Sequence, residues 1–219
     1  LFISDWSYGV IYAVHMSPSG STYTGEAERF IAAAPLPVTD MVIKPADQAM
    51  YFTIGGRKTQ SGLYRVTYKG TESTAAVVPE KDGGEELRKI RHELEALHSV
   101  DAVDAVDAVA KAIPFLGHPD RNIRFAARTV LEHQPVAKWR DQALKVNTNA
   151  DAKITALLGL ARCGGKDLQV PLLQSLAELN SSKLTESQML DALRVLGLCF
   201  IRMGEPEPQT ARDVAAVLN

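Results

Sequence analysis

The chain has 219 residues, of which 46% are hydrophobic and 23% are charged, and its formal net charge is −2. This composition is typical of a folded globular protein and excludes a disordered tail. Because the net charge is slightly negative, electrostatics gives no reason to expect a nucleic acid or an anionic membrane surface as partner. No apolar run approaches the ~18 residues that a membrane-spanning helix needs, so we expect no membrane-spanning segment here.

The first residues already have the character of a strand interior. The sequence begins at Leu1 with neither an initiating methionine nor a signal peptide. We therefore expect a fragment of a longer protein, and its own sequence does not indicate where that protein is located.

The aromatic residues divide the chain into two parts. Ten of the 14 Phe, Trp and Tyr residues fall in residues 1–80. Aromatic and β-branched residues suit strands, whereas Ala, Leu, Glu, Lys and Arg suit helices. We therefore predict a β domain at 1–80, a polar linker at 81–84 and a helical domain at 85–219.

In residues 1–80 the sequence predicts short strands separated by residues that favour turns. Near the end of this part, Tyr64, Val66 and Tyr68 alternate with polar residues, which predicts one aromatic face and a firm register. Short strands at this spacing indicate an all-β sandwich, barrel or propeller. The predicted strands lie at residues 2–5, 9–16, 28–32, 40–44, 49–54 and 63–69.

A basic loop bracketed by glycines, Gly55–Gly62, connects the last two predicted strands. Arg57, Lys58 and Gln60 are the candidate cofactor-binding residues, because an arginine fork suits carboxylates and glycine lets the backbone approach a ligand. An acidic quinone or a sugar would be the ligand. The alternative interpretation is a solvated turn whose glycines supply positive φ. The loop is not a dinucleotide fingerprint, because it lacks G-x-G-x-x-G.

The second part has helical periodicity. Apolar residues recur with spacings of three and four along residues 85–98, as expected for one apolar face of a helix. Alternating helices with short polar connections indicate an α-solenoid. The phrase Asp120-x-x-Ile123-Arg124-x-x-Ala127 resembles the start of the second helix of a HEAT-type repeat. The predicted helices lie at residues 85–98, 119–135, 136–146, 150–163, 168–179, 185–203 and 208–218.

The two cysteines and five histidines show no metal or redox motif. Cys163 and Cys199 lie in apolar helical surroundings, which favours buried free thiols, although a disulfide between them is not excluded. There is no C-x-x-C and no C-x-x-C-H. The histidines are scattered without metal-ligand spacing, and we predict no metal site; they are His15, His92, His98, His118 and His133.

A family resemblance covers residues 1–165 best. The segments "LFISDWSYGVIYAV" and "PLPVTDMVIKPADQAMYFTIGGRKTQSGLYRVTYKG" resemble the last blades of a sorbosone- and glucose-dehydrogenase-like β-propeller. They look most like the large membrane-bound dehydrogenases of planctomycetes and related bacteria. The resemblance implies a multidomain β-then-α fold. That fold would be a partial β-propeller, its last one to two blades, followed by a HEAT-like α-solenoid.

The resemblance also implies a function. The parent protein would be an exported sugar or alcohol dehydrogenase, located in the periplasm or cell envelope. Pyrroloquinoline quinone would serve it as cofactor, and a c-type haem bound outside this fragment would accept the electrons. The fragment shows no complete active site and no catalytic residue. The alternative is a non-catalytic propeller and solenoid scaffold that binds a carbohydrate or a protein partner.

Overall fold

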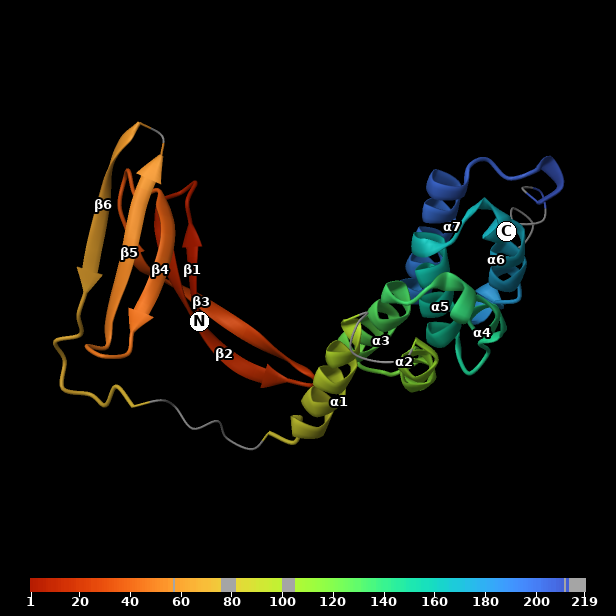
Figure 1. The fold of residues 1–219 in the computed structure, drawn as a ribbon, viewed down its shortest axis with the longest axis horizontal. Coiled ribbons are helices and arrows are strands. Elements are labelled where there is room, and N and C mark those ends of the chain that lie inside the picture. Colours follow the sequence, from red (N-terminus) through yellow and green to blue (C-terminus); the bar gives the residue numbers. More distant parts are fainter. Residues whose placement is uncertain (57, 76–81, 100–104, 211, 213–219) are drawn as a thin grey trace. The chain divides into compact units, whose positions relative to one another are not determined.

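The computed structural model describes residues 1–56, 58–75, 82–99, 105–210 and 212. Contacts within the chain divide it into two compact units, Leu1–Asp82 and Gly83–Asn219. The first unit contains strands and the second contains helices (Figure 1).

Two three-stranded antiparallel sheets form the first unit, with strand orders β1-β2-β3 and β4-β5-β6. Apolar residues of both sheets, among them Ile11, Phe52 and Ile54, gather in a shared small core. Each sheet is a meander, so every strand pairs with its neighbour in the sequence. The strands are β1 (Phe2–Asp5), β2 (Val10–Ser19), β3 (Thr22–Ala32), β4 (Val38–Lys44), β5 (Ala49–Gly56) and β6 (Thr59–Val66).

Trp6 links the two sheets. Its indole Nε1 donates a hydrogen bond of 3.2 Å to the carbonyl oxygen of Gly55. Gly56 has φ +94°, and a Cβ atom there would lie only 3.2 Å from the Trp6 ring. Glycine is therefore required at the end of β5 both for the backbone conformation and for the close approach of the indole.

The predicted strands overlap the observed ones, although β3 begins at Thr22 rather than at residue 28 and β6 spans Thr59–Val66 rather than 63–69. The predicted partial β-propeller is wrong. The described residues form two three-stranded sheets that share one small core, and no propeller blade is found among them. A blade has four strands and stands beside other blades around a channel. The strand pattern alone does not distinguish that arrangement from the observed one.

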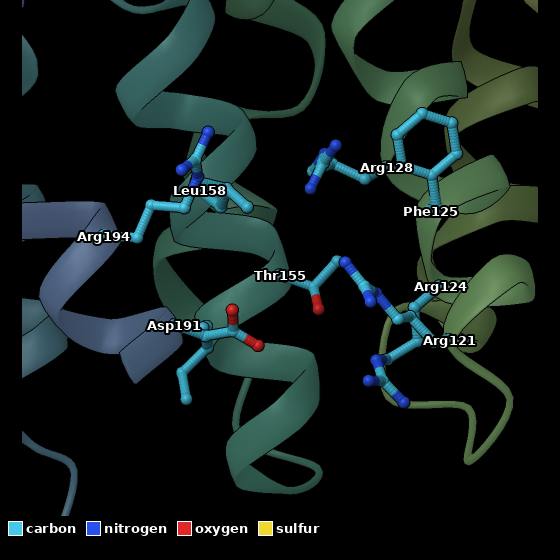
Figure 2. Close-up of a pocket in the computed structure, with 9 residues that line it drawn as sticks. Arg121, Arg124, Phe125, Arg128, Thr155, Leu158, Asp191 and Arg194 are labelled. Carbon is cyan, nitrogen blue, oxygen red and sulfur yellow. The ribbon is translucent and has the colours of Figure 1, made fainter. Parts of the chain in front are cut away.

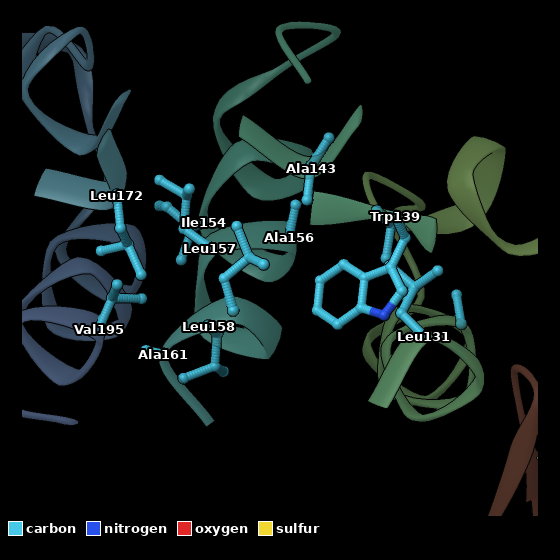
Figure 3. Close-up of a cluster of buried hydrophobic side chains, with 14 of the residues drawn as sticks. Leu131, Trp139, Ala143, Ile154, Ala156, Leu157, Leu158, Ala161, Leu172 and Val195 are labelled. Carbon is cyan, nitrogen blue, oxygen red and sulfur yellow. The ribbon is translucent and has the colours of Figure 1, made fainter. Parts of the chain in front are cut away.

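Within the described residues, the second unit contains the helices α1 to α7, joined by short connections that include 3₁₀ turns, and residues 208–210 are also helical. Its centre is α5, in which every residue from Ala152 to Ala161 is buried. Trp139, only 1% exposed, packs beside α5, and its indole donates a 3.2 Å hydrogen bond to Gln134 (Figure 3). The helices are α1 (Glu85–Glu95), α2 (Ala105–Ala112), α3 (Arg121–His133), α4 (Arg140–Lys145), α5 (Ala150–Cys163), α6 (Gln169–Ala177) and α7 (Glu186–Met203).

Polar contacts align the starts of α3, α5 and α7. Asn149 caps α5, and its Nδ2 donates to the carbonyl oxygen of Gly117, which lies just before α3. Gln188, in the capping box of α7, donates to Oδ2 of Asp151 at 3.1 Å. These contacts place the three helix starts at the same end of the unit, so the helices run in the same direction.

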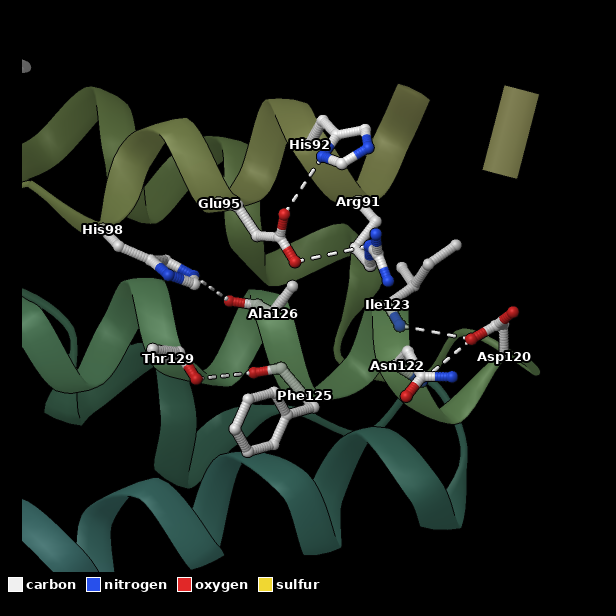
Figure 4. Close-up of polar contacts among 10 residues, drawn as sticks. All are labelled: Arg91, His92, Glu95, His98, Asp120, Asn122, Ile123, Phe125, Ala126 and Thr129. Carbon is white, nitrogen blue, oxygen red and sulfur yellow. Dashed lines mark hydrogen bonds and ion pairs between the residues drawn. The ribbon is translucent and has the colours of Figure 1, made fainter. Parts of the chain in front are cut away.

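A side-chain contact joins the turn after α1 to the middle of α3. Nε2 of His98, in that turn, lies 3.0 Å from the carbonyl oxygen of Ala126 (Figure 4). At the start of α3, the Asp120 carboxylate accepts hydrogen bonds from the backbone N–H groups of Asn122 and Ile123. Such an N-cap stabilises a helix by about 1 kcal/mol, and it explains why α3 begins at Arg121.

The predicted HEAT-like α-solenoid is also wrong. The helices differ in length, from 6 residues in α4 to 18 in α7, and their buried residues form one core cluster. No solenoid is found in the part of the chain that the structure describes. A single HEAT-like phrase at Asp120–Ala127 reflects a capped helix start, which does not require a repeat. Most of the predicted helix at 208–218 falls outside the described residues.

Candidate functional site

The predicted basic loop at Gly55–Gly62 is shorter than expected, because Gly55 and Gly56 belong to β5 and residues 59–62 belong to β6. Lys58 lies in the turn with φ +59°, and Gln60 lies in β6. Both side chains are exposed, and Arg57 lies outside the described residues. The two described side chains enclose no ligand by themselves, so they do not form the cage that a quinone cofactor requires. A role for Arg57, Lys58 and Gln60 in cofactor binding stays a prediction.

The candidate site with the most charged side chains is a groove in the helical unit, which we call the arginine groove. It has a volume of about 470 Å³, within the range of ligand pockets in proteins. Three helices form it, and its charged residues are four arginines and one aspartate (Figure 2). The lining residues are Arg121, Arg124, Phe125, Arg128, Ile154, Thr155, Leu158, Asp191 and Arg194.

One wall of the arginine groove is α3. Arg121, Arg124 and Arg128 are three and four residues apart, which places them on one face of the helix. The opposite face carries the buried residues Ile123 and Ala127, which pack into the core. The same helical periodicity that buries the apolar stripe therefore directs the arginines away from the core.

The floor is α5 and the other wall is α7. Thr155 and Leu158, which are one turn apart on α5, lie at the bottom of the groove, and Leu158 is 9% exposed. On α7, the exposed residues Asp191 and Arg194 are three residues apart and line the same groove. The buried face of α7, which includes Val195 and Cys199, holds this wall against the core.

Because the three helices run in the same direction, the lining residues lie at two levels. At the upper level, Arg128 and Arg194 stand on either side of Leu158 (Figure 2). At the lower level, Arg124 and Asp191 stand on either side of Thr155. The upper level therefore presents positive charge from both walls, whereas at the lower level Arg121 and Arg124 on α3 face the negative charge of Asp191 on α7.

Arg128 is held in place by its neighbours. Its Nε forms an ion pair of 2.9 Å with Oε1 of Glu132, and its guanidinium lies 5.1 Å from the centre of the Phe125 ring. Burial lowers the pKa of Arg128, the nearby Glu132 raises it, and repulsion from Arg162 and Arg194 lowers it again. The guanidinium thus stands in a partly desolvated place, close to other cations.

The other arginines differ in how much of their bonding capacity is used. Arg124 donates through Nη1 to the carbonyl oxygens of His118 and Pro119, which leaves its other nitrogens available. Among the described residues, the side chains of Arg121 and Arg194 have no hydrogen-bond or ion-pair partner. Their planar forks can bind a carboxylate or a phosphate through two hydrogen bonds.

None of the residues that line this groove was among the candidate site residues predicted from the sequence. The signal within α3 was visible, because Arg121, Arg124 and Arg128 flank an exposed Phe125 on the polar face of a predicted helix. A basic stripe interrupted by an aromatic residue indicates a binding surface. The contribution of Arg194 came only from tertiary packing, because no local pattern relates α7 to α3.

Other kinds of site are not evident in the described part of the chain. Residues 1–56, 58–75, 82–99, 105–210 and 212 contain no group of three or more His, Cys, Asp or Glu side chains placed to hold a metal ion. Within the same residues, no helix is both long enough and apolar enough to cross a membrane. Cys163 and Cys199 are both free thiols, half-buried and buried respectively.

Comparison with known proteins gives no indication of the function, which is therefore inferred from the geometry of the groove. The chain matches no family model, no curated protein and no solved structure.

Proposed function

We propose that the helical unit is a binding module for an anionic ligand, which occupies the arginine groove. The observation that carries this proposal is the upper level, where Arg128 and Arg194 face each other across Leu158. Two guanidinium groups on opposing walls repel each other until an anion lies between them. Charge-assisted hydrogen bonds from both walls would then hold that anion.

The charge of the groove differs from that of the chain as a whole. The groove has four arginines and one aspartate, whereas the complete chain has a net charge of −2. A local positive concavity on a slightly acidic protein attracts anions to one place rather than to the whole surface. Specific binding is therefore favoured over a general affinity for polyanions.

The proposal develops the expectation of a non-catalytic binding protein. The lining consists of arginine, threonine, aspartate and apolar side chains, a set that binds and orients a ligand. The dehydrogenase activity, the quinone and the c-type haem remain predictions that only the resemblance supports. We derive no chemical step through either cofactor from the described residues.

A binding titration tests the proposal. Fluorescein-labelled hexaglutamate is titrated with the full chain at low salt, and the fluorescence anisotropy gives the Kd. We expect saturable binding that weakens as salt is added, because the contacts are ionic. Replacing both Arg128→Gln and Arg194→Gln should weaken binding at least tenfold.

A matched variant controls for general charge. Arg202 is also an exposed arginine of α7, but it does not line the groove. Arg202→Gln should leave the Kd unchanged within about twofold. Equal losses in the Arg202 variant and the groove variant would overturn the proposal, since the binding would then follow net charge alone.

A further inference from the structure

We infer that the occupant of the arginine groove is an acidic segment of a partner protein, in which carboxylates one helical turn apart flank an apolar side chain. This inference rests on the proposed anion-binding function and specifies its ligand. Three features of the groove support it: the separation of its two levels, its apolar surface and the position of Asp191.

The separation of the two levels fits two carboxylates on one segment. Arg124 and Arg128 are four residues apart on α3, which corresponds to about 6 Å along the helix axis. Carboxylates at positions i and i+4 of a helical ligand are separated by the same rise. One carboxylate would therefore lie between Arg128 and Arg194, and the next would lie beside Arg124.

The apolar surface of the groove requires an apolar group on the ligand. Phe125 is 57% exposed on the α3 wall, where its ring lies beside the Arg128 guanidinium at the upper level (Figure 2), and Leu158 lies at the floor. A purely charged ligand would leave the Phe125 ring in contact with water. An apolar side chain between two acidic ones would cover that ring and add a hydrophobic contribution to binding.

Asp191 favours a peptide over a phosphate polymer. Its carboxylate lines the lower level of the groove opposite Arg124, where it would repel a chain of phosphates. A peptide instead carries N–H, hydroxyl or ammonium donors that can bind to this carboxylate. The groove is therefore suited to a ligand with donors as well as anions, which a polypeptide provides and inorganic polyphosphate does not.

The test compares probes of matched charge on the full chain. The first probe is a labelled helical peptide with glutamates four residues apart and leucines between them. The second probe is the same peptide with each leucine replaced by serine. Tripolyphosphate and a single-stranded DNA oligonucleotide serve as competitors. We expect the leucine peptide to bind about tenfold more tightly than the serine peptide.

Two variants assign this preference to the groove. Phe125→Ala should remove most of the difference between the two peptides, and it should fold normally because the ring is largely exposed. Asp191→Asn should increase the affinity for tripolyphosphate several-fold and so reduce the selectivity for the peptide. Circular dichroism and thermal melting check that both variants remain folded.

The outcomes separate this inference from the proposed function. If both peptides bind equally tightly, or if DNA or tripolyphosphate binds more tightly than the leucine peptide, the inference is wrong while the anion-binding function stands. If none of the anionic probes binds, both are wrong. A preference for leucine that persists in Phe125→Ala would place the apolar contact elsewhere and overturn the inference.

Discussion

Nε of Arg128 lies 2.9 Å from Oε1 of Glu132, and both side chains are largely buried beside the groove. The same carboxylate oxygen lies 2.8 Å from Nε of Arg162 on α5. Glu132 therefore serves as counter-ion to two arginines, and it connects α3 to α5 at the end of the groove. This shared pair positions Arg128 without neutralising the cluster completely.

Replacing this counter-ion should separate binding from stability. In Glu132→Gln, the positive charge around Arg128 increases, and we expect hexaglutamate to bind about three to ten times more tightly. The free energy of unfolding should fall by about 1–3 kcal/mol, because charged hydrogen-bonding partners are lost. Fluorescence anisotropy and urea denaturation measure the two effects, and the control is Glu93→Gln, which replaces an exposed carboxylate of α1. Weaker binding in Glu132→Gln would show that positioning outweighs charge.

A buried lysine on α5 provides a second prediction. Lys153 is 1% exposed, and its ammonium group donates to the carbonyl oxygen of Ser175 on α6 and pairs with Glu178, the residue after that helix. Removing only the partner, in Glu178→Ala, should lower the free energy of unfolding by about 1–3 kcal/mol. Replacing the lysine itself, in Lys153→Met, should change it by less than about 1 kcal/mol, because an apolar side chain avoids the desolvation penalty. Urea denaturation distinguishes the two, and a larger loss in Lys153→Met would contradict this interpretation.

Two glycines of α7 should respond oppositely to alanine. Gly197 lies inside the helix, and a Cβ atom there would meet nothing within 4 Å. Gly197→Ala should therefore raise stability by about 0.5–1 kcal/mol. Gly204, at the C-cap, has φ +92°, so Gly204→Ala should lower stability by about 1–3 kcal/mol. Thermal denaturation followed by circular dichroism at 222 nm compares the two, and shifts of the same sign would be inconsistent with the structure.

The buried thiol of Cys199 predicts a loss of stability at high pH. Burial raises the pKa of Cys199 to about 11. The thiol of an unfolded chain has a pKa of about 8.5, so the unfolded state loses its proton first as the pH rises. The contribution is therefore complete below about pH 8.5 and is lost progressively as the pH approaches 11, with a slope of up to about 1.4 kcal/mol per pH unit.

The matched variant is Cys199→Ala, compared with the wild-type chain by urea denaturation at pH 8, 9 and 10. The variant should be less stable at pH 8 because it loses packing, but its stability should fall less steeply with pH. Burial also raises the pKa of Cys163, so some dependence on pH should remain. Parallel profiles for the variant and the wild type would contradict the assignment to Cys199.

Local patterns in the sequence predicted most elements, because their signals lie within one segment. The helix at 150–163 agrees with α5, which begins after the cap Asn149 and ends before Gly164. The hairpin of β2 and β3 extends beyond the predicted strands at 9–16 and 28–32, because residues 17–19 also pair with residues 22–24. Pro18 is part of β2, in the outer part of the hairpin that β1 does not cover. A proline is tolerated in such an edge position, since it lacks only an N–H group that the ladder does not need.

The arrangement of these elements could not be predicted in the same way. Neither the shared core of the two sheets nor the position of α7 beside α5 has a signature within one segment. The family resemblance predicted a propeller and a solenoid instead, and both predictions are wrong. The groove could not be predicted for the same reason. The sequence shows the arginines of α3 on one helix face, but Arg194 lies opposite them only because three helices pack together.

Nuclear magnetic resonance of the full chain tests the central claim most directly. The Nε–Hε signals of the arginines are followed while the leucine-containing acidic peptide is titrated. We expect saturable shifts for Arg128 and Arg194, whereas the signals of Arg140 and Arg202 should stay unchanged. Shifts confined to Arg140 or Arg202, or to residues of the β unit, would show that the anionic ligand binds elsewhere and would contradict the account.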